Sequence, residues 1–280
     1  MRIKGVNMSK IESFEIDIPQ LKRVRTVWVY LPDDYKQVGE PSPVIYMHDG
    51  QNLFYDKLTA YGTAWRVDKV MDDIYKAIGR GAIVVGVECY DRRRLSEYSP
   101  WKISTMALMK SRKDLAKDKE NRGGEGALYA EFFTKTLKNA VDAKYNTNKE
   151  RNATAIIGSS MGGLISCYIA LNHQRLYETM GLFSTFSQFN RNAFGKFIKS
   201  TPQTLPQYAL IYCGGKEMEE AHDNKRMLDD SLKLYEQLSK RGISCELLFN
   251  SENKHSETAW GEYFYKFASD FLNRYYNGKQ

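Results

Sequence analysis

The sequence predicts an α/β protein built on a mostly parallel, eight-stranded sheet that helices cover on both faces. Two observations indicate this class. Eight short runs of apolar and β-branched residues recur along the 280-residue chain, and segments with helical spacing of apolar residues lie between most of the later runs. Strands that alternate with helices are typical of a sheet packed between two helical layers.

The first two runs differ from the others. Residues 11–18 and 25–31 alternate apolar and polar side chains, and the second run ends at Pro32. Alternation indicates a strand with only one buried face. We therefore expect an antiparallel pair, with residues 11–18 in an edge-type strand.

The six remaining runs are shorter and more continuously apolar, as buried strands are. They are residues 43–47, 82–87, 153–157, 179–183, 208–213 and 245–249. Helical patterns occupy residues 64–78, 127–145, 161–171, 223–241 and 257–275.

Residues 1–280 are interpreted as a single domain, because the sequence has neither an internal repeat nor a Pro- or Ser-rich linker. The long segment 99–126 lacks a clear strand pattern. Long loops in compact domains are often functional, so this segment is either a surface excursion or a partial cap over the site.

The composition argues for a folded core and against two classes of partner. Hydrophobic residues make up 42% of the chain and aromatic residues 13%, which excludes a disordered protein. The net charge is +7, but Lys and Arg are interspersed with Asp and Glu even in the densest cluster, residues 110–122. We therefore expect a solvated mixed-charge surface and no nucleic-acid partner.

The sequence also bears on compartment and cofactors. No apolar run approaches the roughly 18 residues of a membrane span, and residues 1–20 carry charges throughout, so we expect neither a membrane anchor nor a signal peptide. The four cysteines are far apart, which favours buried free thiols in the cytoplasm over disulfides or a zinc site; they are Cys89, Cys167, Cys213 and Cys245. No metal or organic cofactor is expected, and a homo-oligomer is left open.

Residues 158–163 carry the most informative motif, Gly-Ser-Ser-Met-Gly-Gly, which contains G-x-S-x-G. An apolar run precedes it and a helical pattern follows it. In this context the motif predicts a nucleophile elbow, a tight strand-to-helix turn that exposes Ser160 above the sheet. The alternative is an ordinary glycine-rich turn.

A serine nucleophile needs a base, and the chain has four histidines. In enzymes with this elbow the base follows the serine, so His48 is in the wrong order. His173 ends the elbow helix, where a positive charge suits the helix dipole. Of the other two, His255 is favoured over His222 because it lies between the last strand and the final helix.

The acid that orients the base should follow the strand at 208–213. Glu217 is the first carboxylate beyond that strand and is the predicted acid. The loop is rich in carboxylates, so Glu219, Glu220 and Asp223 remain alternatives.

Two backbone N–H groups are expected to bind the oxyanion. Met161 supplies one, because it follows the nucleophile. The second should come from the loop after the strand at 43–47, where Gly50 permits a turn that presents the N–H of Gln51. His48 and Asp49 either hold this loop by hydrogen bonds, which we favour, or contact substrate.

These residues resemble a known family. Residues 44–54, Val-Ile-Tyr-Met-His-Asp-Gly-Gln-Asn-Leu-Phe, resemble a signature of the putative esterase (esterase D-like) family of α/β-hydrolases. Further matches are residues 29–32, 82–87, 94–100 and 158–163, and His255 with Trp260 after it. The family includes feruloyl and acetylxylan esterases, enterochelin-type siderophore esterases and S-formylglutathione hydrolase.

The resemblance implies an α/β-hydrolase fold over about residues 12–275 and the same site: Ser160, His255, Glu217, and the N–H groups of Gln51 and Met161. The chain departs from the family at Glu217, where many relatives have Asp. It also lacks the proline often found after the strand at 179–183, and Asn139 replaces a common proline.

Several side chains near these motifs are candidates for substrate contact. They are Asp49, Tyr98, Trp101 and Trp260, with Met106 and Met109; packing of segment 99–126 explains Tyr98, Trp101 and the two methionines equally well. Arg94 is expected to pair with Glu97, and Arg92 and Arg93 to be solvated.

The expected function is a serine ester hydrolase that acts through an acyl-enzyme on a small-molecule ester. Small acyl or hydroxycinnamoyl esters of sugars, or a siderophore lactone, are the expected substrates. Two alternatives remain open: an acyltransferase with the same elbow, and a non-catalytic binding protein on this scaffold.

Overall fold

The computed structural model describes residues 10–59, 62–89, 92–105 and 120–278 of the chain. Within them one sheet contains eight strands in the order β1-β2-β4-β3-β5-β6-β7-β8. The strands are β1 (Lys10–Ile18), β2 (Arg23–Leu31), β3 (Val44–His48), β4 (Ile83–Val87), β5 (Thr154–Ser159), β6 (Thr179–Phe183), β7 (Tyr208–Lys216) and β8 (Ser244–Lys254).

The strand directions confirm the predicted fold class. β2 runs antiparallel to both β1 and β4, and every other neighbouring pair is parallel. β1 lies at one edge of the sheet, as its alternating pattern predicts. The carboxyl ends of the parallel strands therefore meet along one side of the sheet, which is where open α/β sheets place their ligands.

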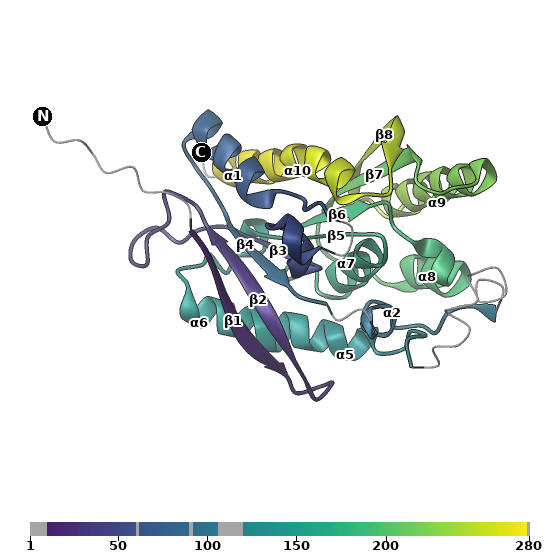
Figure 1. The fold of residues 1–280 in the computed structure, drawn as a ribbon, viewed down its shortest axis with the longest axis horizontal. Helices are drawn as coiled ribbons and strands as arrows, with labels where there is room; N and C mark the ends of the chain where they lie inside the picture. Colours follow the sequence, from purple (N-terminus) through teal and green to yellow (C-terminus); the bar gives the residue numbers. More distant parts are fainter. Residues whose placement is uncertain (1–9, 60–61, 90–91, 106–119, 279–280) are drawn as a thin grey trace, which may run out of the picture.

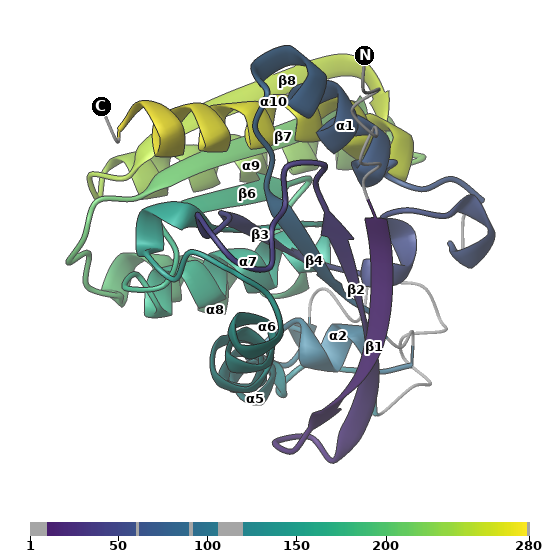
Figure 2. The same ribbon diagram turned by 90° about the vertical axis from the view of Figure 1, so that its left-hand side faces the viewer.

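Helices cover both faces of this sheet (Figures 1 and 2). One face packs on α1 (Val67–Ile78) and α10 (Glu257–Asn277), and the other packs on α7 (Met161–Asn172), α8 (Arg191–Ser200) and α9 (Ala221–Ser239). Also on the second face lie α5 (Gly126–Glu131), the π-helical turn η3 (Phe132–Leu137) and α6 (Lys138–Lys144).

Strand β3 shows how the sequence builds the two layers. Successive side chains of a strand point to opposite faces. Accordingly Val44 and Tyr46 belong to the cluster under α5–α7, while Ile45 and Met47 belong to the cluster under α1 and α10. All four are buried, which explains why this strand reads as a continuous apolar run.

Two strands extend beyond their apolar runs. β7 and β8 continue to Lys216 and Lys254, which pair with each other across an irregularity in the register near Gly214. The added residues are largely polar because they lie outside the layer that the helices cover. Bounds predicted from apolar runs therefore end before either strand does. This extension places the residues that follow, Glu217 and His255, side by side.

The segment 99–126 is fastened to the domain in its described parts. Lys102 and Gly123 form a β-bridge within the segment, and the backbone N–H of Ser104 donates to the carbonyl of Phe189, outside it, at 2.9 Å. Asn190, before α8, donates to the carbonyl of Lys102 at 2.9 Å. Met106 and Met109 lie outside the described residues.

Candidate active site

Ser160 occupies the turn between β5 and α7. Its φ of 57° and ψ of −121° are unusual for a residue with a side chain. A Cβ at position 158 would lie 2.5 Å from the carbonyl carbon of Gly162, so strand and helix approach each other too closely for any residue except glycine. The local geometry is that of the predicted elbow, and Ser160 is partly exposed.

The backbone on both sides of Ser160 is fixed. Its N–H donates to the carbonyl of Phe183 at 2.9 Å, and its carbonyl accepts from the N–H of Phe186 at 3.1 Å. The end of β6 and the loop after it thus hold the elbow. Met161 begins α7, and the first N–H groups of a helix have no partner within it. Its N–H is therefore available at the helix end.

Glu217 and His255 are hydrogen-bonded, with 2.7 Å between Oε2 and Nδ1. The Glu217 side chain is fully buried, while that of His255 is 26% exposed. Oε1 of Glu217 accepts from the N–H of Gly214 at 2.5 Å and from the Ser184 hydroxyl. Ser184 was not among the site residues expected from the sequence, where its only signal is a serine in place of the proline that the resemblance led us to expect after residues 179–183.

The competing residues lie elsewhere. Glu219 and Glu220 are exposed, and Asp223 accepts from Arg226 at 2.8 Å. His222 lies 3.3 Å from the same Asp223 carboxylate on the surface of α9. His173 follows α7, where burial, aided by Lys135, lowers its pKa and so opposes the positive charge expected there.

The loop of residues 49–54 follows β3 and is fixed through Asp49. Arg94 donates two hydrogen bonds to the Asp49 carboxylate, at 2.7 and 2.8 Å. The Tyr98 hydroxyl accepts from the Asp49 N–H at 3.0 Å, and the Asp49 carbonyl accepts from the Asn52 N–H at 2.8 Å. Every polar group of Asp49 is therefore engaged, as a loop-holding role requires.

One expectation about the contacts of this loop is wrong, and it concerns the partner of Arg94. The positive φ in the loop belongs to Asp49, at 55°. Gly50 is needed for close packing, because a Cβ there would lie 2.6 Å from the carbonyl oxygen of Gly86. Arg94 pairs with Asp49 and not with Glu97, whose carboxylate instead accepts from Arg23 and Arg25.

Gln51 is tied to the neighbouring strand by its side chain. Its Oε1 accepts from the N–H of Cys89 at 3.0 Å, just beyond β4. The side chain thus anchors the short 3-10 turn η1 (Gly50–Asn52). The backbone of Gln51 therefore has a fixed place in this turn.

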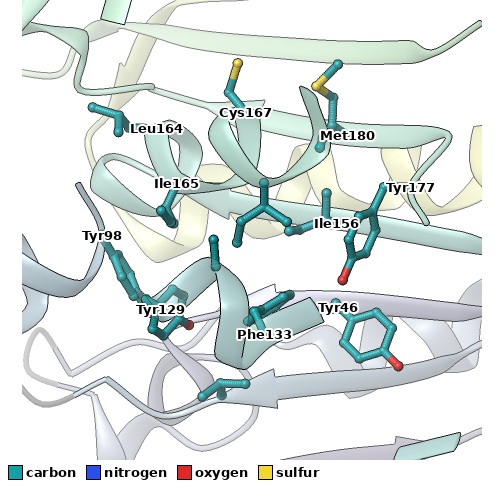
Figure 3. Close-up of a cluster of buried hydrophobic side chains, with 14 of the residues drawn as sticks. Tyr46, Tyr98, Tyr129, Phe133, Ile156, Leu164, Ile165, Cys167, Tyr177 and Met180 are labelled. Atoms are coloured by element: carbon teal, nitrogen blue, oxygen red, sulfur yellow. The ribbon is translucent and has the colours of Figure 1, made fainter. Parts of the chain in front are cut away.

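His48 lies beneath this loop, 3% exposed, with its Nδ1 3.1 Å from the Tyr129 hydroxyl. Burial lowers its pKa to about 3, so the imidazole is neutral at physiological pH. Figure 3 shows Tyr98, Tyr129 and Phe133 gathered on one side of the buried cluster, and all three rings lie within 6 Å of the His48 ring. His48 therefore serves as packing beneath the loop.

The residues considered for substrate contact are mostly buried. Tyr98 has no exposed surface and Trp260 is 5% exposed, with the edge of its indole against the His255 ring. Trp101 packs on Tyr168, Phe194 and Phe197. Arg92 is exposed and Arg93 pairs with Glu120.

The four cysteines are free, and three of them are buried. In the part of the chain that the structure describes, no group of three or more His, Cys, Asp or Glu side chains is arranged to hold a metal ion. None of the described helices is long and apolar enough to cross a bilayer.

Comparison with known families decides what kind of protein carries this site. The model of the family described as "Putative esterase" matches residues 18–266. The chain belongs to this esterase family. The match spans nearly the whole sheet and includes Ser160, Glu217 and His255. Membership of this family supports ester hydrolysis as the class of reaction.

Individual relatives are distant. The chain is 25% identical over 232 residues to the uncharacterised protein YbbA of Bacillus subtilis (strain 168), covering 82% of this esterase-family chain and 84% of YbbA. A ferulic acid esterase structure superimposes with a TM-score of 0.68 at 16% identity, covering 95% of this chain and 98% of that one. The siderophore hydrolase EstB from Aspergillus nidulans gives 0.69 at 16% identity, with 96% and 98% covered. These likenesses show the α/β-hydrolase fold.

Proposed function

We propose that the protein is a serine carboxylic-ester hydrolase that works through an acyl-enzyme. The observation that carries this proposal is the 2.7 Å hydrogen bond between Glu217 and His255, at the same sheet edge as the Ser160 elbow. An acid-oriented imidazole next to an accessible serine hydroxyl is the arrangement that activates the hydroxyl for nucleophilic attack, and Ser160 is partly exposed.

In this mechanism His255 takes the proton of Ser160 through Nε2 as the hydroxyl attacks the ester carbonyl. The bond from Nδ1 to Glu217 fixes which ring nitrogen carries the resting proton, and the buried carboxylate stabilises the imidazolium that forms. His255 then gives the proton to the leaving alcohol. Water then attacks the carbonyl carbon of the acyl-enzyme while His255 takes a proton from it. His255 returns this proton to the Ser160 oxygen as the acid is released.

The negative charge on the tetrahedral carbonyl oxygen needs donors that are already in place. The N–H groups of Met161 and Gln51 are the proposed pair. The first lies at the N-terminus of α7, where the helix dipole also favours negative charge. The second lies in the turn that Arg94 and Tyr98 fix through Asp49. Donors held this rigidly need little reorganisation during the reaction.

The proposed substrates are small acyl or hydroxycinnamoyl esters, such as sugar esters, or a siderophore lactone. The similarity to a ferulic acid esterase and to a siderophore hydrolase supports this range. We also propose a cytoplasmic location, which the free cysteines support because thiols stay reduced there.

The test is hydrolysis of p-nitrophenyl acetate, p-nitrophenyl butyrate and methyl ferulate by the purified protein and by Ser160→Ala. We expect turnover by the wild type and a loss on the order of a thousandfold or more in the variant, because the three residues act as a unit. Turnover that survives in Ser160→Ala would overturn the nucleophile assignment. Product esters formed from added alcohols would instead indicate an acyltransferase.

A further inference from the structure

The two oxygens of the Glu217 carboxylate have different partners. Oε2 faces His255, whereas Oε1 accepts from the Gly214 N–H and from the Ser184 hydroxyl. Ser184 lies in the loop after β6, is completely buried and has no part in the mechanism above. It therefore needs a separate explanation.

The direction of the Ser184 hydrogen bond follows from its neighbours. Nε1 of Trp260 lies 2.9 Å from Ser184 Oγ. An indole N–H can only donate, so it occupies a lone pair of the serine oxygen. An ionised carboxylate can only accept, so the hydroxyl proton points at Glu217. The chain of donors runs from Trp260 through Ser184 to Oε1 of Glu217.

Trp260 contacts the base as well as supporting the acid. The edge of its indole meets the His255 ring at nearly a right angle, 85°, with ring centroids 4.8 Å apart. Trp260 belongs to the first turns of α10, which begins two residues after His255. One buried side chain thus contacts the imidazole directly and reaches its carboxylate through Ser184.

The backbone of Ser184 is held at a cost. Its φ is 45°, a value that residues with a side chain seldom adopt, and its N–H donates to the Tyr212 carbonyl at 2.6 Å. Strain of this kind persists only where surrounding contacts impose it. Here those contacts are the backbone bond to Tyr212 and the side-chain bonds to Glu217 and Trp260.

We propose that Ser184 and Trp260 are positioning residues that hold the Glu217 carboxylate in the orientation His255 requires. The inference rests on the proposed function, since it concerns the same site. Without the hydroxyl, Oε1 keeps only the Gly214 N–H, and the carboxyl group is free to rotate about its last bond. His255 then loses its fixed orientation, and proton transfer slows while substrate binding is unaffected.

Steady-state kinetics with p-nitrophenyl acetate test this for Ser184→Ala and Trp260→Phe. A hydrogen bond to a charged group corresponds to about a tenfold to hundredfold change in rate. We therefore expect kcat of Ser184→Ala to fall by that factor with KM unchanged, and kcat of Trp260→Phe to fall less. Trp28→Phe is the matched control, because its indole nitrogen has no acceptor among the described residues.

Ser184→Gly separates the hydroxyl from the backbone. Glycine accepts a positive φ without strain, so this variant keeps the fold while it removes the same hydrogen bond. It should match Ser184→Ala in kcat. Wild-type activity in Ser184→Gly would overturn the proposal, because only the strained backbone would then matter.

A double-mutant cycle shows whether Ser184 acts through Glu217. In a Glu217→Gln background, Ser184→Ala should cost nothing further, since the carboxylate that it serves is gone. Equal losses in both backgrounds would overturn the proposal. If Glu217→Gln itself has wild-type activity, the proposed acid is wrong, which is a different outcome from a failure of Ser184 alone.

A spectroscopic measurement is independent of catalysis. The proton between His255 Nδ1 and Glu217 should resonate far downfield in the proton NMR spectrum of the wild type. It should move upfield in Ser184→Ala as that bond weakens and stay in place in Trp28→Phe. An unmoved resonance in Ser184→Ala would contradict a positioning role.

Discussion

His48 illustrates how burial changes a titratable residue at this site. Its imidazole is enclosed by aromatic rings beneath the loop of residues 49–54, and its pKa is lowered to about 3. In the unfolded chain an ordinary histidine has a pKa near 6.5. Between these values the unfolded state binds a proton that the folded state does not.

Stability should therefore fall as the pH falls from about 6.5 toward 3, by up to about 1.4 kcal/mol per pH unit from this group. Above about pH 6.5 the imidazole is neutral in both states, so this group causes no loss of stability there. We expect the wild type to lose stability relative to His48→Phe as the pH falls across this range, because the variant lacks the group that titrates. Urea unfolding of both proteins at several pH values measures this. A difference that stays constant with pH would contradict a buried neutral imidazole.

The predictability of single residues depends on how local their signals are. Ser160 and Met161 could be assigned to a strand-to-helix turn because the motif that predicts this turn occupies six consecutive residues. Glu217 could only be narrowed to four carboxylates, since the choice depends on how far β7 continues. Ser184 could not be found, because its contacts with Glu217 and Trp260 span 33 and 76 residues and leave no local pattern.

Among the elements, the loop of residues 49–54 depends on α2 (Arg94–Glu97) for its shape. Both nitrogens that bind Asp49 belong to one planar guanidinium, and the Asp49 carboxylate raises the pKa of Arg94 even though burial opposes its charge. A lysine cannot form two parallel hydrogen bonds with a carboxylate in this way.

Arg94→Lys should lower kcat/KM for p-nitrophenyl acetate roughly tenfold, because the loss of one charge-assisted hydrogen bond loosens the Gln51 donor. Arg93→Lys is the matched control, since its partner Glu120 is largely exposed and its pairing has little effect on the loop. Equal activity of Arg94→Lys and the wild type would show that the loop holds its shape without this pair.

The boundaries of elements are less predictable than their order. All eight strands and five of the helical segments follow from apolar patterns. The polar ends of β7 and β8 do not, because strand pairing alone maintains them. α8 was missed because its two fully buried side chains, Phe194 and Ile198, make too weak an apolar pattern.

At the scale of the whole molecule, a buried ion-pair network joins the start of β2 to α2 and α5. Arg23 and Arg25 both donate to Glu97, whose side chain is fully buried, and Arg23 also binds Glu125. Burial raises the pKa of Glu97 even with two arginines beside it. The network secures the β1–β2 hairpin, which reaches past the rest of the sheet in Figure 2.

Glu97→Gln should destabilise the protein by about 3–5 kcal/mol, because it leaves two arginines largely buried without their shared carboxylate. Urea unfolding measures this. Glu131→Gln removes an exposed pair with Lys135 and should change stability by less than about 1 kcal/mol. Similar small effects in both variants would mean that water or other groups replace Glu97.

The backbone of Ser160 has a consequence for the history of such a chain. Its positive φ costs on the order of 1–3 kcal/mol, which glycine at the same position would avoid. Selection for heat tolerance alone would therefore favour replacement of the very residue proposed to attack the substrate. Directed evolution of a hardier variant has to screen for turnover in every round, or the lineage drifts toward stable but inert descendants.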